Sequence, residues 1–136
     1  MIEYINTPIA KVIISALLGA IIGYTRKQQH IGSRTFSLIC LGSTIFALVS
    51  ISPLFGGDVD SKRIIAQIVS GVGFLGVGVI WKSKGELHGL TTAATIWTTA
   101  GLGILTALGN WDLLAVSFVL VCIILERKHI QIKRQD

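Results

Sequence analysis

The chain has 136 residues, of which 51% are hydrophobic and only 14% are charged, and its formal net charge is +5. An ordinary soluble domain contains about 25% charged residues, and a chain this short cannot bury half of its residues. The composition therefore excludes a soluble globular domain and a disordered chain, and two cysteines are too few for a disulfide scaffold. We expect a single transmembrane domain covering residues 1–136.

Five stretches with few or no charged residues predict five membrane-spanning helices. About 20 helical residues, rising about 1.5 Å each, cross a hydrocarbon core that is roughly 30 Å thick. The predicted helices cover residues 8–25, 34–53, 62–81, 89–108 and 111–127, and a basic tail follows at 127–136. Lys11 lies inside the first helix, and we expect its ammonium to extend outward to the membrane interface. The predicted fold is an all-α bundle of five transmembrane helices.

The basic residues predict how these helices are oriented, because the cytoplasmic connections of membrane proteins are rich in lysine and arginine. Nine of the twelve basic residues lie in or beside the connection after the first helix, the connection after the third helix and the tail. The other three are Lys11, Lys62 and Arg63, on the side where most acidic residues also lie. We therefore expect the amino terminus outside and the carboxyl terminus in the cytoplasm. The positive charge then reflects membrane topology, and we expect no nucleic-acid partner.

Small residues recur every four positions along the first helix, at Ser15, Gly19 and Gly23. This spacing lets two helix backbones approach closely, which matters in lipid because lipid supplies no hydrophobic drive for helix association. The pattern predicts contact either with another helix of the same chain or with a second copy in a homo-oligomer. In a chain with five helices, contact within the chain is favoured.

Polar residues begin the third helix, at the predicted outer face. Asp60 precedes Arg63 by three residues, and its expected role is to cap the free backbone N–H groups of the helix. A weak cation site formed together with Asp58 is the alternative. Gln67, about one turn further in, is the only long polar side chain well inside a predicted span.

Four glycines follow within eight residues of the third helix, at Gly71, Gly73, Gly76 and Gly78. The first three match the dinucleotide-binding pattern G-x-G-x-x-G. That pattern requires a strand, a turn and a helix, with an acidic residue about 20 positions further on, whereas here it lies within an apolar run. We therefore expect helix packing at these glycines, or else a flexible point of the helix that lines a ligand path.

A cluster of polar residues is predicted at the cytoplasmic end of the bundle. It comprises a residue that opens the second helix, two in the third connection and two that open the fourth helix: Arg34, Glu86, His88, Thr91 and Thr92. Arg34 could pair with Glu86, bind a lipid phosphate or simply extend to the interface. We expect these five residues to contact a partner or a ligand.

The sequence offers little for catalysis or for metal binding. His30 and His129 lie in basic segments, and Cys40 and Cys122 lie in apolar helices without the spacing of metal ligands. We therefore expect no enzyme activity, no metal site and no cofactor. Asp112 and Glu126 lie only at the two ends of the predicted fifth helix, and no Asp or Glu lies deeper inside a predicted span, whereas Mg²⁺ is usually held by carboxylates and water. Direct Mg²⁺ transport by one chain is therefore disfavoured, while a pore between subunits remains an alternative.

Three motifs resemble those of the MgtC/SapB membrane proteins. Residues 60–80 read DxxRIxAQIVSGVGFLGxGxI, residues 89–97 read GLTTAATIW, and residues 32–35 and 41–43 read GSRT and LGS. The resemblance extends from about residue 9 to residue 126. It implies a multi-pass protein of the bacterial inner membrane with five transmembrane helices.

The chain also departs from the pattern of this family. Family members commonly carry Glu-Arg-Glu after the first helix, whereas this chain has Thr25, Arg26 and Lys27. Some members carry Asn at the position of Thr91, which is tied to function in the virulence-associated branch. That branch has a soluble cytoplasmic domain after the last helix, and we expect this chain, which stops at Asp136, to comprise the transmembrane domain alone.

The resemblance implies a regulator more than a transporter. Members of the family are linked to growth in low magnesium, to survival of pathogens inside host cells and to restraint of ATP synthase. We therefore expect a non-enzymatic regulator of a membrane partner such as ATP synthase. The alternative is an ion channel or transporter, for Mg²⁺ or another cation, which could form between subunits.

Overall fold

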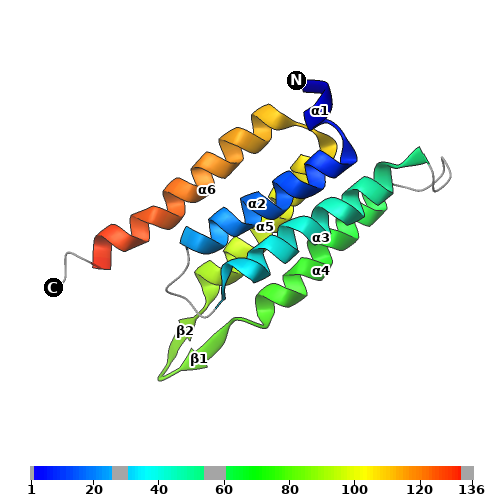
Figure 1. Ribbon diagram of the computed structural model, residues 1–136. Coiled ribbons are helices and arrows are strands. Elements are labelled where there is room, and N and C mark those ends of the chain that lie inside the picture. The colour runs from blue at the N-terminus through cyan, green and yellow to red at the C-terminus, as the bar shows by residue number, and fades with distance from the viewer. Residues whose placement is uncertain (1, 26–30, 54–60, 133–136) are drawn as a thin grey trace.

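The computed structural model describes residues 2–25, 31–53 and 61–132, which form a bundle of helices (Figure 1). The helices are α1 (Ile2–Ile5), α2 (Pro8–Thr25), α3 (Ser33–Ile51), α4 (Ser61–Val77), α5 (Leu90–Leu108) and α6 (Trp111–Ile132). Two short strands, β1 (Trp81–Ser83) and β2 (Glu86–His88), lie between α4 and α5. The five long helices confirm the prediction of a helical bundle, whereas α1 and the strands were not predicted.

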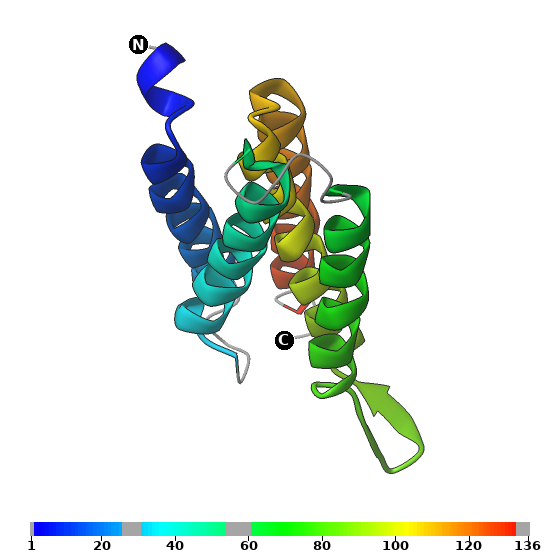
Figure 2. The same cartoon turned by 90° about the vertical axis from the view of Figure 1, so that its right-hand side faces the viewer.

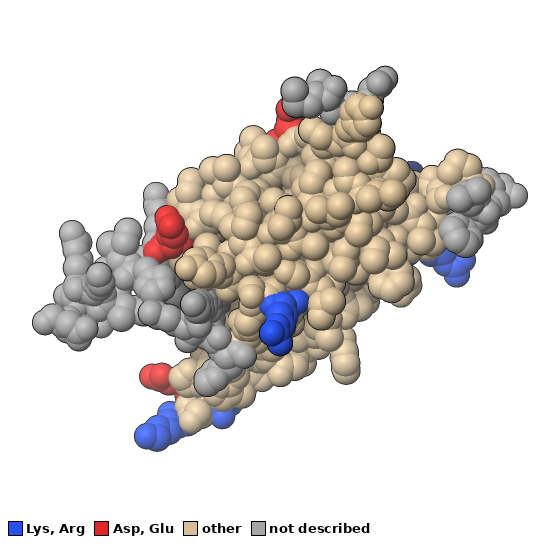
Figure 3. All heavy atoms as spheres, in the orientation of Figure 1, with Lys and Arg blue, Asp and Glu red and all other residues tan. Residues whose placement is uncertain are grey.

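Among the described helices, α2, α3 and α5 are long and apolar enough to cross a membrane. With 17 residues, α4 is about 26 Å long, slightly short of the hydrocarbon core. With 22 residues, α6 is long enough, but it ends in the charged residues that follow Leu125. The face shown in Figure 3 is formed largely by uncharged residues, as a surface in contact with lipid requires.

The central helix of the bundle is α5, which packs against α2, α3, α4 and α6 (Figure 2). The main buried cluster takes large apolar side chains from three helices, such as Ile22 of α2, Phe36 of α3 and Ile96 of α5, and Leu114 of α6 joins it. A smaller cluster around Ile68 of α4 lies against α3 and α5. Because α5 contacts every other long helix, its residues largely determine how the bundle packs.

The helix predicted at residues 62–81 ends earlier, at Val77, and a β-hairpin follows it. The strands pair antiparallel, with Trp81 opposite His88 and Ser83 opposite Glu86. Lys84 and Gly85 form the two-residue loop, with φ of 49° and 88°. Two consecutive positive φ values are typical of the tight hairpin turn whose twist matches that of paired strands. The apolar residues 79–81 continue the hydrophobic run of α4, which explains why the sequence pattern did not separate them from the helix.

The ends of two other helices also differ from the prediction. The basic tail was expected to begin at residue 127, but α6 continues to Ile132. Glu, Arg and Lys are good helix formers, and basic residues at the end of a helix interact favourably with its dipole. The predicted helix 34–53 ends at Ile51, because Ser52 precedes a proline and adopts an extended conformation.

Candidate functional site

The hairpin, the start of α3 and the end of α6 lie at one end of the bundle (Figure 1). Both Arg34 and Glu86 are exposed there. Figure 2 shows the start of α3 and the hairpin on opposite sides of this end. In the part of the chain that the structure describes, no ion pair joins Arg34 to Glu86. The structure therefore places the two residues at the expected end but removes the ion-pair hypothesis.

His88 interacts with Trp81 across the hairpin. The rings stack with their centroids 5.6 Å apart and an angle of 20° between their planes. The two residues face each other in the strand register, and stacked aromatic pairs of this kind stabilise neighbouring strands. The contact stabilises the pairing of the two strands, and Leu87, Lys82 and Glu86 are exposed on the hairpin.

Gly89 joins the hairpin to α5. Its φ of 86° is a conformation that side chains disfavour, and a Cβ placed there would overlap the carbonyl oxygen of Val79. The backbone of residue 89 therefore passes directly against the end of α4. Sequence reasoning placed this glycine in a family motif without assigning it a role, although glycine before a predicted helix is a signal for such a turn.

Thr91 and Thr92 lie in the first turn of α5, where Thr91 is half-buried and Thr92 is buried. Thr95 donates a hydrogen bond of 2.7 Å from its hydroxyl to the carbonyl oxygen of Thr91. The hydroxyls of Thr98 and Thr99 bond backbone carbonyls one turn earlier in the same way, each at 2.7 Å. These hydroxyls therefore donate to the backbone of their own helix, as threonine hydroxyls inside helices commonly do, and not to a ligand.

Gly19 and Gly23 lie where α2 meets α3. A Cβ on Gly19 would be 2.6 Å from the Cα of Ser37, and a Cβ on Gly23 would overlap the backbone of Ser33. Ser15, on the same face, is fully buried. The small residues of α2 therefore allow direct contact between two helix backbones within one chain. Gly103 of α5 approaches α3 equally closely.

The glycines of α4 behave differently from the expected packing motif. At Gly71 and Gly73, no atom of the described residues lies within 4 Å of an added Cβ. The nearest atoms to a Cβ on Gly76 belong to Ala93, at 3.6 Å, which is an ordinary contact. Gly78 meets only carbonyl oxygens at the end of its own helix. Among the described residues, Gly71, Gly73 and Gly78 therefore make no close contact with another helix, because residue spacing does not reveal which face of a helix is covered.

The predicted residues at the start of α4 are only partly described. Asp60, with its expected capping or cation-binding role, lies outside the described residues. Arg63 and Gln67 are both exposed on α4. Within the described part of the chain, no three His, Cys, Asp or Glu side chains are grouped as a metal site would require.

A buried lysine at the opposite end of the bundle is a feature that sequence reasoning missed. Lys11 is only 9% exposed, and its Nζ donates a hydrogen bond of 2.8 Å to the carbonyl oxygen of Ala107, in the last turn of α5. The ammonium bonds the last turn of α5, at the end of the bundle where α2 begins. Free carbonyls at the end of a helix attract a cation, and Gly109, which ends α5 with a φ of 72°, was the signal that marked this end.

Close to this contact, Asn6 links the start of the chain to α6. The indole N–H of Trp111 donates a hydrogen bond of 3.1 Å to Oδ1 of Asn6. A Cβ on Gly109 would lie 3.0 Å from the same Oδ1 and 3.2 Å from Nζ of Lys11. The polar groups of Asn6 and Lys11 therefore gather around the α5–α6 turn and hold it against the first residues of the chain.

Comparisons with known proteins agree on one family. The model of the MgtC family matches residues 12–133. Protein MgtC of Salmonella typhimurium (strain LT2) is 43% identical over 118 residues, which cover 84% of this chain and 49% of that protein. Protein MgtC of Brucella abortus (strain 2308) is 43% identical over 107 residues, covering 77% of this chain and 44% of that protein. The chain thus spans about half the length of these relatives, and no solved structure matches it.

Proposed function

Because the chain belongs to the MgtC family, we propose that it is a non-enzymatic regulator of a membrane partner in adaptation to low magnesium or host stress. The three apolar helices of spanning length and the family together identify a membrane protein. The partner suggested by the family resemblance is ATP synthase. The family resemblance suggests the bacterial inner membrane, and the distribution of basic residues favours an orientation with the hairpin on the cytoplasmic side.

The observation that supports this function is the exposed hairpin. It extends beyond the helices at one end of the bundle (Figure 2). Leu87, 60% exposed, lies opposite Lys82 on one face of the hairpin, and Trp81, 50% exposed, lies on the other face. Aromatic and apolar side chains surrounded by charged residues are typical of surfaces that bind proteins. The stacked Trp81–His88 pair and the tight Gly89 junction hold the hairpin in place, so little conformational entropy is lost on binding.

The polar groups inside the bundle support a regulator more than a cation transporter. The described threonine hydroxyls in the middle of α5 donate to backbone carbonyls of their own helix. The buried charge that the structure describes is the ammonium of Lys11, which repels cations. Transporters instead place ionisable or polar groups along the path of the ion. A cation path between copies of the chain is the alternative that the experiment below addresses.

The proposal is tested by photo-crosslinking in native membranes. A photoreactive amino acid replaces Leu87 on the hairpin, and the matched control replaces Val116 of α6, which is similarly exposed at 59%. Cells grown in low magnesium are irradiated, and the crosslinked proteins are identified by mass spectrometry. We expect ATP synthase subunits to be captured from position 87 and not from position 116.

Two results would contradict the proposal that this chain is a regulator. One is capture of the same set of abundant membrane proteins from positions 87 and 116. The other is magnesium flux into proteoliposomes that contain only this protein, which would establish the transporter. If one other membrane protein were captured from position 87 alone, the chain would still be a regulator, but its partner would be that protein and not ATP synthase.

A further inference from the structure

Two polar side chains on α4 face outward without a hydrogen-bond partner. Gln67 and Ser70 are both exposed and lie one helical turn apart. Neither side chain makes a hydrogen bond to any residue that the structure describes. In other helices, the hydroxyls of Ser15 and Thr44 donate to backbone carbonyls of their own helix. The hydrogen-bonding groups of Gln67 and Ser70 are therefore available to something outside the described chain.

Both side chains lie at the depth of the membrane interior. Ser70 is the tenth of the 17 residues of α4, close to the middle of the helix. Ile68, which lies between them in sequence, belongs to a buried cluster with Ala47 of α3 and Ile104 of α5. Because α3 and α5 are long and apolar enough to cross a membrane, the outward side of α4 at this level faces lipid and not water. An amide or hydroxyl without a partner is costly in lipid, so Gln67 and Ser70 indicate a contact with another polar group.

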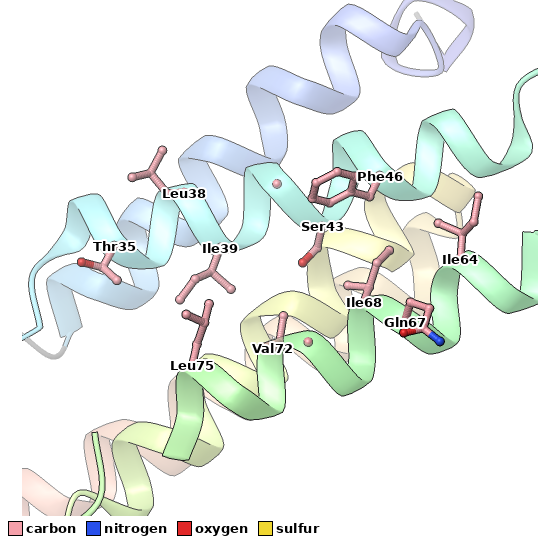
Figure 4. Close-up of a pocket in the computed structure, with 12 residues that line it drawn as sticks. Thr35, Leu38, Ile39, Ser43, Phe46, Ile64, Gln67, Ile68, Val72 and Leu75 are labelled. Atoms are coloured by element: carbon pink, nitrogen blue, oxygen red, sulfur yellow. The ribbon is translucent and has the colours of Figure 1, made fainter. Parts of the chain in front are cut away.

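The outward face of α4 has the residue spacing of a helix–helix contact. It is formed by Gln67, Ser70, Phe74 and Val77, whose separations of three, four and three positions are those of a coiled-coil seam. All four are exposed, with Phe74 at 82% and Val77 at 67%. Figure 2 shows α4 at the edge of the bundle, and Figure 4 shows Ile68 directed toward α3 while Gln67 lies at the rim of the groove between the two helices. The seam therefore points away from the helices that α4 contacts within the chain.

The seam is flanked by small residues. Ala66 and Gly73 border it on one side and Gly71 on the other, at the positions that flank a coiled-coil seam. No described atom lies within 4 Å of a Cβ placed on Gly71 or on Gly73. Small side chains at these positions allow a second helix backbone to approach closely, which is how helices associate in lipid. These two glycines have no close contact within the chain, and a helix lying on this face would supply one.

The chemistry of the seam favours a second copy of this chain over an unrelated helix. The amide of Gln67 has a partly positive N–H₂ group and a partly negative carbonyl oxygen, so two such amides are complementary and form two hydrogen bonds. In a symmetric dimer, a residue next to the two-fold axis meets its own equivalent, so a second Gln67 arrives at the required depth. Arg63 continues the spacing one turn earlier, but it lies near the start of α4, where water and salt screen the repulsion between like charges.

We propose that α4 is the interface of a homodimer in the membrane, with the two-fold axis along the membrane normal. The two Gln67 amides bond each other, Ser70 and its equivalent lie beside the axis, and Phe74 and Val77 complete the contact. Strand β1 begins at Trp81, four positions after Val77. The dimer therefore brings two hairpins close together on the same side of the membrane. This inference does not depend on which protein the hairpin binds.

The interface is tested by disulfide formation in native membranes, with single cysteines in a chain whose Cys40 and Cys122 are replaced by alanine. Cysteine is placed in turn at the four seam positions 67, 70, 74 and 77. The matched controls are Val69→Cys and Leu75→Cys, which are exposed on other sides of the same helix. With copper phenanthroline as oxidant, we expect covalent dimers from the seam positions, at least about fivefold more than from the two controls.

The contributions of the amide and of the small residues are measured by energy transfer between two labelled populations of the full chain in phospholipid vesicles. Gln67→Leu should weaken dimerisation about tenfold, because the two amide hydrogen bonds are lost, whereas Gln67→Asn keeps an amide and should retain most of the affinity. Gly73→Leu should weaken it at least about tenfold by separating the two backbones. The matched control Gly101→Leu makes the same change on α5, with no described atom within 4 Å of the new Cβ, and should dimerise as the original chain does. Cooperative thermal unfolding establishes that each variant is folded.

Equal disulfide formation at the seam and control positions, or energy transfer that Gln67→Leu and Gly73→Leu leave unchanged, would overturn the α4 dimer. A photoreactive amino acid at position 70 provides a further check. If it captures a different membrane protein and no second copy, the face belongs to that protein and the dimer is wrong. None of these results bears on the partner of the hairpin, which is tested from position 87.

Discussion

The ammonium of Lys11 donates a hydrogen bond of 2.8 Å to the carbonyl oxygen of Ala107, which lies 96 positions later in the chain. The contact joins the first turn of α2 to the last turn of α5, the helix that packs against every other long helix. A cation at the end of a helix interacts favourably with the free carbonyls and with the helix dipole. Lys11 is therefore a structural residue of the bundle, whereas its charge alone suggested a surface position.

Replacing Lys11 with Met should lower the free energy of unfolding by about 1.5–3 kcal/mol, because a charge-assisted hydrogen bond is lost and carbonyls at the end of α5 lose their donor. Unfolding in mixed detergent micelles, followed by circular dichroism, measures this change. Lys82→Met on the exposed hairpin is the control and should change stability by less than about 0.5 kcal/mol. Equal stability of both variants would show that the bond to Ala107 contributes nothing.

Gly23→Ala should destabilise the chain by about 1–3 kcal/mol or more, because the new methyl group would overlap the backbone of Ser33 and push α2 away from α3. Gly73→Ala makes the same chemical change where no described atom lies within 4 Å, so it should be neutral or stabilising by up to about 1 kcal/mol. The same unfolding measurement compares the two variants. A larger loss for Gly73→Ala than for Gly23→Ala would contradict the packing described for α2 and α4.

Gly89→Ala should loosen the hairpin, because alanine at a φ of 86° costs about 1–2 kcal/mol and its methyl group would overlap the carbonyl oxygen of Val79. Limited proteolysis with trypsin measures the effect as the rate of cleavage after Lys82 and Lys84. We expect cleavage to be several times faster than in the original chain. The control Gly101→Ala, inside α5 with no described atom near the new methyl group, should be cleaved at the original rate.

The orientation in the membrane is tested with single cysteines in a background where Cys40 and Cys122 are replaced by alanine. Asn110 and Ser83 are both exposed and lie at opposite ends of the bundle. An impermeant thiol reagent added to intact spheroplasts should label Asn110→Cys. Ser83→Cys should stay unlabelled until the membrane is permeabilised. The reverse pattern would place the hairpin outside and exclude a cytoplasmic partner for it.

The helices could be predicted from the sequence because charges are absent where lipid surrounds the chain, and this signal is local. Gly19 was assigned to helix packing for a similarly local reason, since its spacing from Ser15 and Gly23 defines one face of α2. Gly71 and Gly73 show the limit of that reasoning, because glycines also occur at positions that no described residue contacts closely. The contact of Lys11 depends on where residue 107 lies in space, which composition and periodicity do not contain.

The candidate site was predictable in position but not in its contacts. The end of the bundle that carries Arg34 and Glu86 follows from the alternation of helix directions. The pairing of His88 with Trp81 depends on a hairpin register that three-residue strands specify only weakly in sequence. The burial of the Ser43 hydroxyl between α3 and α4 could not be predicted, because it depends on which side chains surround this residue in the fold.

The backbone contact of Gly23 with Ser33 joins two helices that follow each other along the chain. A ribosome therefore delivers both partners of this contact before α4, α5 and α6 have been synthesised. Contacts between neighbouring segments form quickly because little loop entropy opposes them. The α2–α3 pair can thus insert as a preassembled unit onto which α5 later docks. Lys11 cannot donate to the carbonyl oxygen of Ala107 until α5 has docked. This hydrogen bond therefore forms late in the folding of the bundle.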